Sequence, residues 1–329
     1  MPDAAVRSNG EVRAGSHVLS LFANPLNARI LRAHLDGPQR LTKLHEKIGW
    51  SAHTTLRAGI GKLRKAGAVE RAGATGSGSS TATALTPAGR DMIFVADVVE
   101  RWLAFSPTGP ISPDSDAAKG AVKALSGGWS STLMRALANR PFTLTELDRL
   151  IPDVSYPSLE RRLVSMRATG QIEPLEAAGR GTPYVVTEWL RRSIAPLCAA
   201  GRCERRYLGA DTAPITDVEV EAAFMLAMPL APMPRNAAGT CMLAVQTESS
   251  ECDGGGHDLS GVTVELERGE IASCTASVDQ SPPTWALGTA EGWLDLVIDG
   301  DLTALRLGGT RPELALNMIN GLHVALFDE

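Results

Sequence analysis

The sequence has little of what disulfide-rich and metal-binding proteins depend on. Its 329 residues include five cysteines and no Cys-x-x-Cys pair, and aromatic residues make up 5% of the chain. An odd number of cysteines without close pairs argues against a disulfide framework and against a zinc site. We therefore interpret the thiols as buried or inert, and we predict that the protein holds neither a metal ion nor a cofactor.

Long apolar segments are also missing. Hydrophobic residues make up 44% of the chain, but they form no run of about 18 or more, as a membrane-spanning helix would require. Residues 1–17 are mixed and charged and lack the apolar centre of a signal peptide, so we predict a disordered arm there. The sequence thus predicts a cytoplasmic protein that does not enter a membrane and is long enough for two or three domains.

The motifs that identify common enzyme classes do not occur. The chain has no GxSxG, no P-loop, no HExxH and no Rossmann glycine pattern. None of its six histidines has a cysteine, serine or carboxylate at a spacing that marks a catalytic set. We therefore predict that the protein is not an enzyme and has no catalytic residues.

Positive charge is scarce in one part of the chain only. Residues 211–329 have 4 basic and 19 acidic residues, a net charge of −15. Residues 20–105 have 12 basic and 6 acidic residues, and residues 119–208 have 14 and 8, so each segment has a net charge of +6. Such asymmetry is typical of basic modules that bind phosphate, followed by an acidic module that avoids it.

An internal repeat coincides with the two basic segments, because residues 28–70 align with residues 130–173. The matched apolar pairs are Leu31 with Leu133, Leu35 with Leu137, Leu44 with Leu147, Leu56 with Leu159, Ile60 with Leu163 and Leu63 with Met166. In each copy the periodicity predicts three helices, a hairpin and a long fourth helix, over residues 87–105 and 188–208. A Pro- and Ser-rich linker is predicted over residues 107–117.

This order of elements resembles the winged helix-turn-helix. The second copy is similar to the HxlR-like family of bacterial regulators over LSGGWSSTLMRAL (Leu125–Leu137), FTLTELDRLIPDVSYPSLERRL (Phe142–Leu163) and TPYVVTEWLRRSIAPL (Thr182–Leu197). The first copy is similar to the wider winged-helix group, with LTPAGR (Leu85–Arg90) at the exit from its hairpin. The resemblance implies two winged-helix domains, over residues 18–106 and 118–209, that bind double-stranded DNA and regulate transcription.

The second copy departs from that family in two respects. HxlR-like proteins often have a cysteine just before the first helix, and residues 118–122 contain none. A typical member also has one winged helix and forms a dimer, whereas this chain has two copies. The two copies can form an intramolecular pseudo-dimer, and a homodimer of the whole chain is the alternative.

The third helix of each copy is the expected reader of the major groove. In the first copy, the predicted DNA contacts are Lys43, His53, Thr54, Arg57, Arg64 and Arg71. In the second copy, they are Tyr156, Ser158, Arg161, Arg162 and, at the wing tip, Arg180. Arg57 is the candidate base reader, because a guanidinium can donate to guanine O6 and N7 together. Glu160 occupies the position of Arg57 in the second copy, so that copy is predicted either to bind DNA more weakly or to serve dimerisation instead.

The fourth helix of the first copy has an apolar stripe that is too rich for a lone surface helix. Its members recur at helical spacing: Met92, Val95, Val98, Val99, Trp102 and Phe105. We expect this stripe to pack against another helix, either from the second copy or from a second chain.

The acidic segment has its own pattern of helices and strands. Helices are predicted over residues 216–228, 284–298 and 312–326, and strands over residues 240–247, 261–266, 270–276 and 302–307. Val262–Ala276 and Thr284–Leu322 resemble the sterol-carrier-protein-2-like fold. The resemblance implies a third domain over residues 215–329, with an apolar tunnel for lipids or other hydrophobic ligands.

The candidate residues for such a ligand site are large and apolar: Phe224, Met225, Met228, Trp285 and Trp293. Ordinary core packing is the alternative role for all five. We expect an α+β protein that regulates transcription in response to a small hydrophobic molecule. The alternatives are a protein-interaction scaffold whose winged helices do not bind DNA, and a carrier of hydrophobic ligands.

Overall fold

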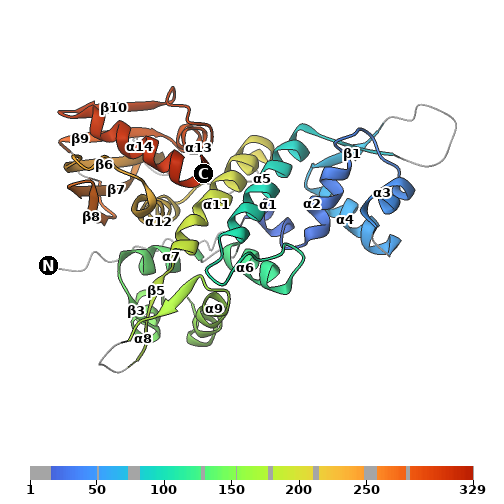
Figure 1. The fold of residues 1–329 in the computed structure, drawn as a ribbon, viewed down its shortest axis with the longest axis horizontal. Coiled ribbons are helices and arrows are strands. Elements are labelled where there is room, and N and C mark those ends of the chain that lie inside the picture. Colours follow the sequence, from blue (N-terminus) through green and yellow to red (C-terminus); the bar gives the residue numbers. More distant parts are fainter. Residues whose placement is uncertain are drawn as a thin grey trace. The chain divides into compact units, whose positions relative to one another are not determined.

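The computed structural model describes residues 16–49, 52–72, 82–126, 130–152, 154–176, 181–209, 215–247, 258–278 and 282–328. Helices and strands both contribute to it (Figure 1), which confirms the predicted α+β class. Residue contacts divide the chain into two compact units. The N-terminal unit contains Ser16–Ser126 and Ala199–Thr212, and the C-terminal unit contains Gly127–Cys198 and Ala213–Glu329.

The N-terminal unit is built on the first winged helix. Its elements are α1 (His17–Leu21), α2 (Pro25–Ala33), α3 (Leu41–Ile48), α4 (His53–Lys65), β1 (Val69–Arg71), β2 (Thr83–Leu85) and α5 (Pro87–Ala104). The core side chains are fully buried: Leu26, Ile30, Leu31, Leu44, Leu56 and Leu63. The predicted arm over residues 1–17 overlaps α1, whose Val18 and Leu19 are buried, while residues 1–15 lie outside the described part.

A threonine fixes the corner at which the hairpin meets α5. The Thr86 hydroxyl lies 2.6 Å from the carbonyl oxygen of Gly67 and 3.0 Å from that of Ala68. The same hydroxyl accepts a hydrogen bond from the Gly89 N–H at 3.0 Å. Thr86 therefore caps α5 and holds it against the turn that follows α4, as the motif at residues 85–90 predicts.

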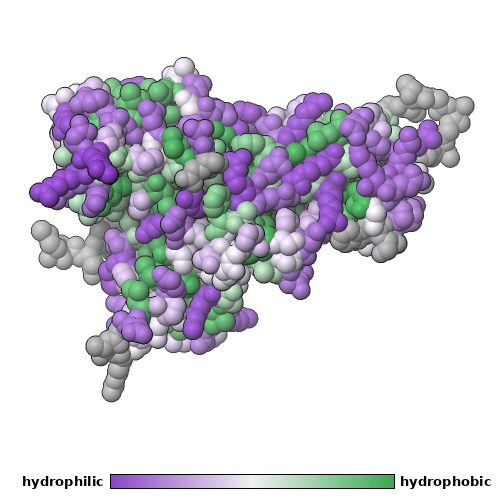
Figure 2. Space-filling view, viewed as in Figure 1, coloured by the Kyte–Doolittle hydropathy of each residue, from purple (hydrophilic) through white to green (hydrophobic). Residues whose placement is uncertain are grey.

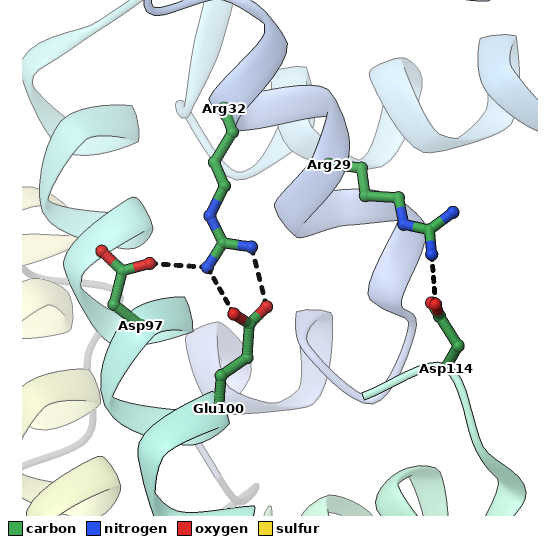
Figure 3. Close-up of polar contacts among 5 residues, drawn as sticks. All are labelled: Arg29, Arg32, Asp97, Glu100 and Asp114. Atoms are coloured by element: carbon green, nitrogen blue, oxygen red, sulfur yellow. Dashed lines mark hydrogen bonds and ion pairs between the residues drawn. The ribbon is translucent and has the colours of Figure 1, made fainter. Parts of the chain in front are cut away.

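Ion pairs tie α2 to α5 and to the segment that follows α5 (Figure 3). The Arg32 guanidinium binds the Glu100 carboxylate at 2.8 Å and the Asp97 carboxylate at 2.5 Å. Arg29 pairs with Asp114, so the segment that follows α5 is anchored rather than free. The viewed surface over α2 and α5 is accordingly mainly hydrophilic (Figure 2).

The end of the predicted linker is already helical, because α6 (Asp116–Ser126) begins within residues 107–117. This helix packs on α1 and buries Ala118, Ala121 and Val122. The sequence assigns these residues to the second winged helix, whereas the contacts place them in the N-terminal unit. The predicted elements of the second copy do not include this helix, and its packing on α1 depends on residues far away in the sequence.

The division between the units falls within α11 (Ile194–Tyr207), the last helix of the second copy. In the N-terminal unit, the buried Glu204 carboxylate accepts hydrogen bonds from the Ser16 hydroxyl and the Val18 N–H, both at 2.8 Å. This carboxylate caps the start of α1 from a residue 188 positions away in the sequence. The end of the second copy therefore completes the unit of the first.

The predicted apolar stripe of α5 is buried, and its buried members are Met92, Val95, Val98, Val99 and Trp102. Phe105 is an exception at 47% exposed, because α5 ends at the preceding residue. Besides packing on α2, α5 meets α11, where Arg206 pairs with Asp91 at 3.1 Å and Arg202 lies over the Phe94 ring. The helix thus has neighbours from both copies.

The C-terminal unit begins with the second winged helix. Its elements are α7 (Ser130–Asn139), β3 (Phe142–Thr143), α8 (Leu144–Leu150), α9 (Tyr156–Ala168), β4 (Ile172–Pro174), β5 (Pro183–Val186) and α10 (Glu188–Arg192). The strands form an antiparallel sheet in the order β3-β5-β4. In the first copy, a bridge between Gln39 and Thr83 occupies the place of the β3–β5 pairing. The threonine corner is also repeated, since the Thr187 hydroxyl lies 2.8 Å from the Gly170 carbonyl oxygen.

The predicted fourth helix over residues 188–208 is interrupted. α10 ends at Arg192, Ser193 lies between the helices, and α11 begins at Ile194. Pro196 has no N–H to donate to the carbonyl group four residues earlier, so a continuous helix would lose a hydrogen bond there. In the first turn of a new helix, the missing N–H has no cost.

The acidic segment forms a five-stranded sheet with helices packed on it. Its elements are α12 (Asp217–Ala227), η2 (Met228–Leu230), β6 (Gly239–Thr247), β7 (Asp258–Glu267), β8 (Glu270–Thr275), β9 (Thr284–Thr289), α13 (Ala290–Asp299), β10 (Leu305–Gly309) and α14 (Pro312–Phe327). The strand order is β10-β9-β6-β7-β8, in which only the β6–β9 pairing is parallel. Val262, Val264 and Leu266 are buried, as their alternation along β7 predicts.

The predicted helix over residues 284–298 is wrong in its first part. Residues 284–289 form β9, which pairs with β6 on one side and β10 on the other. Thr289 then caps α13 through a hydrogen bond from the Gly292 N–H at 3.2 Å. The six residues are a strand because two distant strands satisfy their backbone groups, a pairing that local periodicity does not reveal.

Within the C-terminal unit, α12 joins the acidic domain to the second winged helix. It packs on α7, and Arg135 of α7 pairs with Glu221 of α12. From α10, the Arg191 guanidinium donates to the carbonyl oxygen of Met225 at 3.1 Å, at the end of α12. Burial, partly opposed by Arg135, raises the pKa of Glu221. The contact between α12 and the second winged helix therefore includes half-buried polar groups.

Candidate nucleic-acid interface

The first winged helix presents its predicted DNA contacts to solvent. α4 turns Leu56 and Leu63 into the core, and its opposite face is exposed. The exposed residues predicted to contact DNA are Lys43 on α3, His53, Thr54, Arg57 and Arg64 on α4, and Arg71 on β1. Helices α3 and α4 and the β1–β2 hairpin follow one another in the order that the sequence predicts for the first copy.

The cations of this face differ from those of the scaffold behind it. Among the described residues of α3, α4 and β1, the exposed cations that form no ion pair are Lys43, Arg57, Lys62, Arg64, Lys65 and Arg71. In contrast, Arg29 and Arg32 of α2 are held by carboxylates of α5 and residue 114, and Lys47 pairs with Asp36. The charge on the α3–α4–β1 face, which we call the basic face, is therefore available to an external anion.

His53 is less free than the sequence predicts. Its ring stacks on that of His45 from α3, with centroids 4.0 Å apart and planes 5° from parallel. The stack joins the two helices of the helix-turn-helix at the first residue of α4. Sequence reasoning missed His45, because its relation to His53 depends on the turn between the helices.

The second winged helix has the same scaffold but a different charge. Residues 40–72 of the first copy have 8 basic and 2 acidic residues, a net of +6, whereas the aligned residues 143–175 have 4 basic and 5 acidic residues, a net of −1. The basic charge of the second copy thus lies mostly outside its helix-turn-helix. A helix-turn-helix that neutralises phosphate needs more basic than acidic residues on this surface.

Two of the three arginines of α9 interact with their own helix or are half-buried, whereas Arg167 is exposed. Arg161 is exposed but turns back on its own helix, where it donates to the Pro157 carbonyl oxygen at 3.2 Å and to the Ser158 hydroxyl at 3.3 Å. Arg162 is half-buried, and burial lowers the pKa of its guanidinium to about 10. Tyr156 is 43% exposed. Arg180 lies outside the described residues.

The predicted ligand residues lie mainly in the core of the acidic domain. Phe224, Met225, Met228 and Trp293 are buried, and the Phe224 and Trp293 rings meet edge to face with centroids 4.9 Å apart. The Trp293 indole N–H donates to the Ala244 carbonyl oxygen at 2.8 Å. Trp285 is separate from this group: it is half-buried on β9 and lies over Gly308 of β10. Four of the five residues thus have core contacts, the alternative that the sequence left open.

Two of the described thiols are buried, Cys203 and Cys241, and Cys274 is half-buried. Burial raises the pKa of Cys203, Cys241 and Cys274 to about 12. Over the part of the chain that the structure describes, no three His, Cys, Asp or Glu side chains gather in a way that would hold a metal ion. In that same part, no helix is both long and apolar enough to span a membrane.

No family model matches the sequence, and no curated protein matches it.

Proposed function

We propose that this protein is a transcriptional regulator that binds double-stranded DNA through the basic face of its first winged helix. The observation that carries the proposal is the set of exposed cations on α3, α4 and β1 that form no ion pair among the described residues, whereas Arg29 and Arg32 of α2 are paired with carboxylates. Such a surface releases counterions from DNA, which supplies most of the affinity of non-specific binding.

In this arrangement α4 lies in the major groove. Arg57, on the exposed face of α4, reads a guanine through a bidentate contact, worth about 1–3 kcal/mol of discrimination against another base. Lys43 of α3, Arg64 near the end of α4 and Arg71 of β1 bind phosphates, which position the helix without reading sequence. The proposal therefore separates one specificity residue from three affinity residues.

The acidic domain is the proposed sensor of a small hydrophobic molecule. Its α12 packs on α7 and receives a hydrogen bond from Arg191 of α10, so a ligand that moves α12 changes the second winged helix first. The effector acts only if it binds the two states of this interface with different affinity. No cofactor and no catalytic step is needed for such a response.

The test is fluorescence anisotropy of labelled duplex DNA with the full-length protein, over salt concentrations from about 50 to about 200 mM. We expect binding that weakens steeply with salt, and a random-sequence pool will then yield the preferred site. Arg57→Lys should keep most of the non-specific affinity but lose preference at one base pair, because a lysine is a point charge without the bidentate fork.

The matched control is Lys119→Ala, which removes one exposed cation of the same unit from α6, outside the basic face. Lys43→Ala should reduce the salt slope by about one contact, and Lys119→Ala should not change it. Absence of binding at low salt, or equal effects of the two alanine variants, contradicts the proposal.

A further inference from the structure

The helix face that we propose to read DNA in the first copy is apolar, with a carboxylate, at the equivalent place in the second copy. The repeat places His53, Arg57, Gly61 and Lys65 of α4 opposite Tyr156, Glu160, Val164 and Ala168 of α9, all of them exposed. These residues recur every fourth position and so form one stripe along each helix. On α4 the stripe is basic with a small residue in its middle, and on α9 it is apolar with a carboxylate in its middle.

The α9 stripe is a strongly exposed apolar surface. Val164 is 61% exposed and Tyr156 43%, and Leu175, just after β4, is 39% exposed. Glu160 and Glu173 lie beside them, are exposed, and form no ion pair within the described ranges. We call Tyr156, Glu160, Val164 and the end of β4 the acidic face. Protruding apolar side chains are typical of a protein interface, and carboxylates without a cation partner disfavour a nearby phosphate.

The basic face of α4 is complementary to it in charge and in shape. Arg57 and Lys65 have no carboxylate partner within the described residues. Gly61 between them is exposed, and a Cβ built there would meet nothing within 4 Å. Because this residue has no side chain, the surface of α4 has a low point between Arg57 and Lys65. The exposed Val164 can occupy that low point while Glu160 meets Arg57. A net charge of −1 facing one of +6 adds long-range attraction.

We infer that the acidic face of one molecule binds the basic face of a second copy of this chain, given the proposed role of the basic face in DNA binding. The contact joins two different surfaces, so it is heterologous. It covers Arg57, and DNA and the second molecule therefore compete for one surface. Self-association therefore lowers the concentration of protein that can bind DNA.

The experiment is sedimentation velocity of the full-length protein over a concentration series, at about 50 and about 200 mM salt, with and without duplex DNA. We expect mass to increase with concentration at low salt and to fall when DNA is added. Glu160→Arg should weaken self-association at least tenfold and leave DNA affinity undiminished. Glu267→Arg, the same reversal at an exposed residue of β7, should change neither.

A charge swap gives the sharpest test. Arg57→Glu should abolish both DNA binding and self-association, and combining it with Glu160→Arg should restore self-association alone. The inference is overturned by a protein that stays monomeric at every concentration, by self-association that DNA does not reduce, or by a double variant without recovery. Arg57→Glu that binds DNA normally but no longer self-associates would instead overturn the proposed function and support the contact.

Discussion

Replacing Gly89 by alanine should destabilise the first winged helix, although alanine is the better helix former. Gly89 lies in the first turn of α5, where its N–H binds the Thr86 hydroxyl. A Cβ at this position would lie 2.1 Å from the carbonyl oxygen of Ala68 and 2.6 Å from a methyl carbon of Leu85. The leucine can rotate away, but the carbonyl oxygen belongs to the backbone at the start of β1. The first turn of α5 must therefore move.

The magnitude follows from three opposing effects. Overpacking of this kind costs about 1–3 kcal/mol. Displacing the turn also weakens the Thr86 cap, which is worth about 1 kcal/mol. Alanine regains up to about 1 kcal/mol of helix propensity. We expect a net loss of roughly 2 kcal/mol, which lowers the urea midpoint of the N-terminal unit by about 1 M for a slope of about 2 kcal/mol per M.

Gly61→Ala is the matched control, since it makes the same change in an exposed helical position with open space around the new methyl group. It should raise the stability by up to about 1 kcal/mol. Urea unfolding of both variants, followed by circular dichroism and by hydrogen exchange of the α5 amides, compares them. A Gly89→Ala protein as stable as Gly61→Ala would refute the close approach of α5 to the carbonyl group of residue 68.

Three further predictions concern the C-terminal unit and the thiols. Trp293→Phe should cost about 1–2 kcal/mol in urea unfolding, because the Ala244 carbonyl oxygen loses its buried donor; no loss of stability would contradict that hydrogen bond. Glu221 has a pKa raised above its ordinary 4.5, chiefly by burial, so the folded state holds its proton more tightly and stability falls as the pH rises through the raised value. Glu221→Gln should flatten this part of the stability profile, and a slope equal to that of the wild type would argue against the burial. Native protein in a thiol-reagent titration at neutral pH should react rapidly at no more than two of its five cysteines, because the pKa of the other three thiols, Cys203, Cys241 and Cys274, is raised to about 12. Rapid reaction of a third cysteine would contradict this protection.

Much of each winged helix follows from local pattern. The spacing of Leu56 and Leu63 places one face of α4 in the core, and Gly67 ends the turn after it with a positive φ of 72°. The exposure of Arg57 is then a matter of helix geometry, because residues on the opposite side of the stripe must face solvent. The basic face is therefore predictable from the amino-acid sequence alone.

Other features depend on residues far apart in the chain. Nothing near Arg32 in the sequence indicates that Asp97 and Glu100 neutralise it, while Arg57 has no ion-pair partner among the residues that the structure describes. The interior position of Arg162 is likewise hidden, since its neighbour Arg161 has the same side chain and is exposed. The sequence therefore predicted more DNA contacts in the second copy than the charge and the burial of its residues support.

Periodicity along the chain by itself determined where most helices of the two copies lie, since a helix satisfies its backbone within a few neighbouring residues. Only the tertiary structure decided that residues 284–289 are a strand, that residues 118–126 belong to the first unit, and that α12 joins the acidic domain to α7. Each of these depends on a partner at long sequence separation. A backbone segment or an apolar face takes its final role from what it pairs with, and that partner is not encoded in its own spacing.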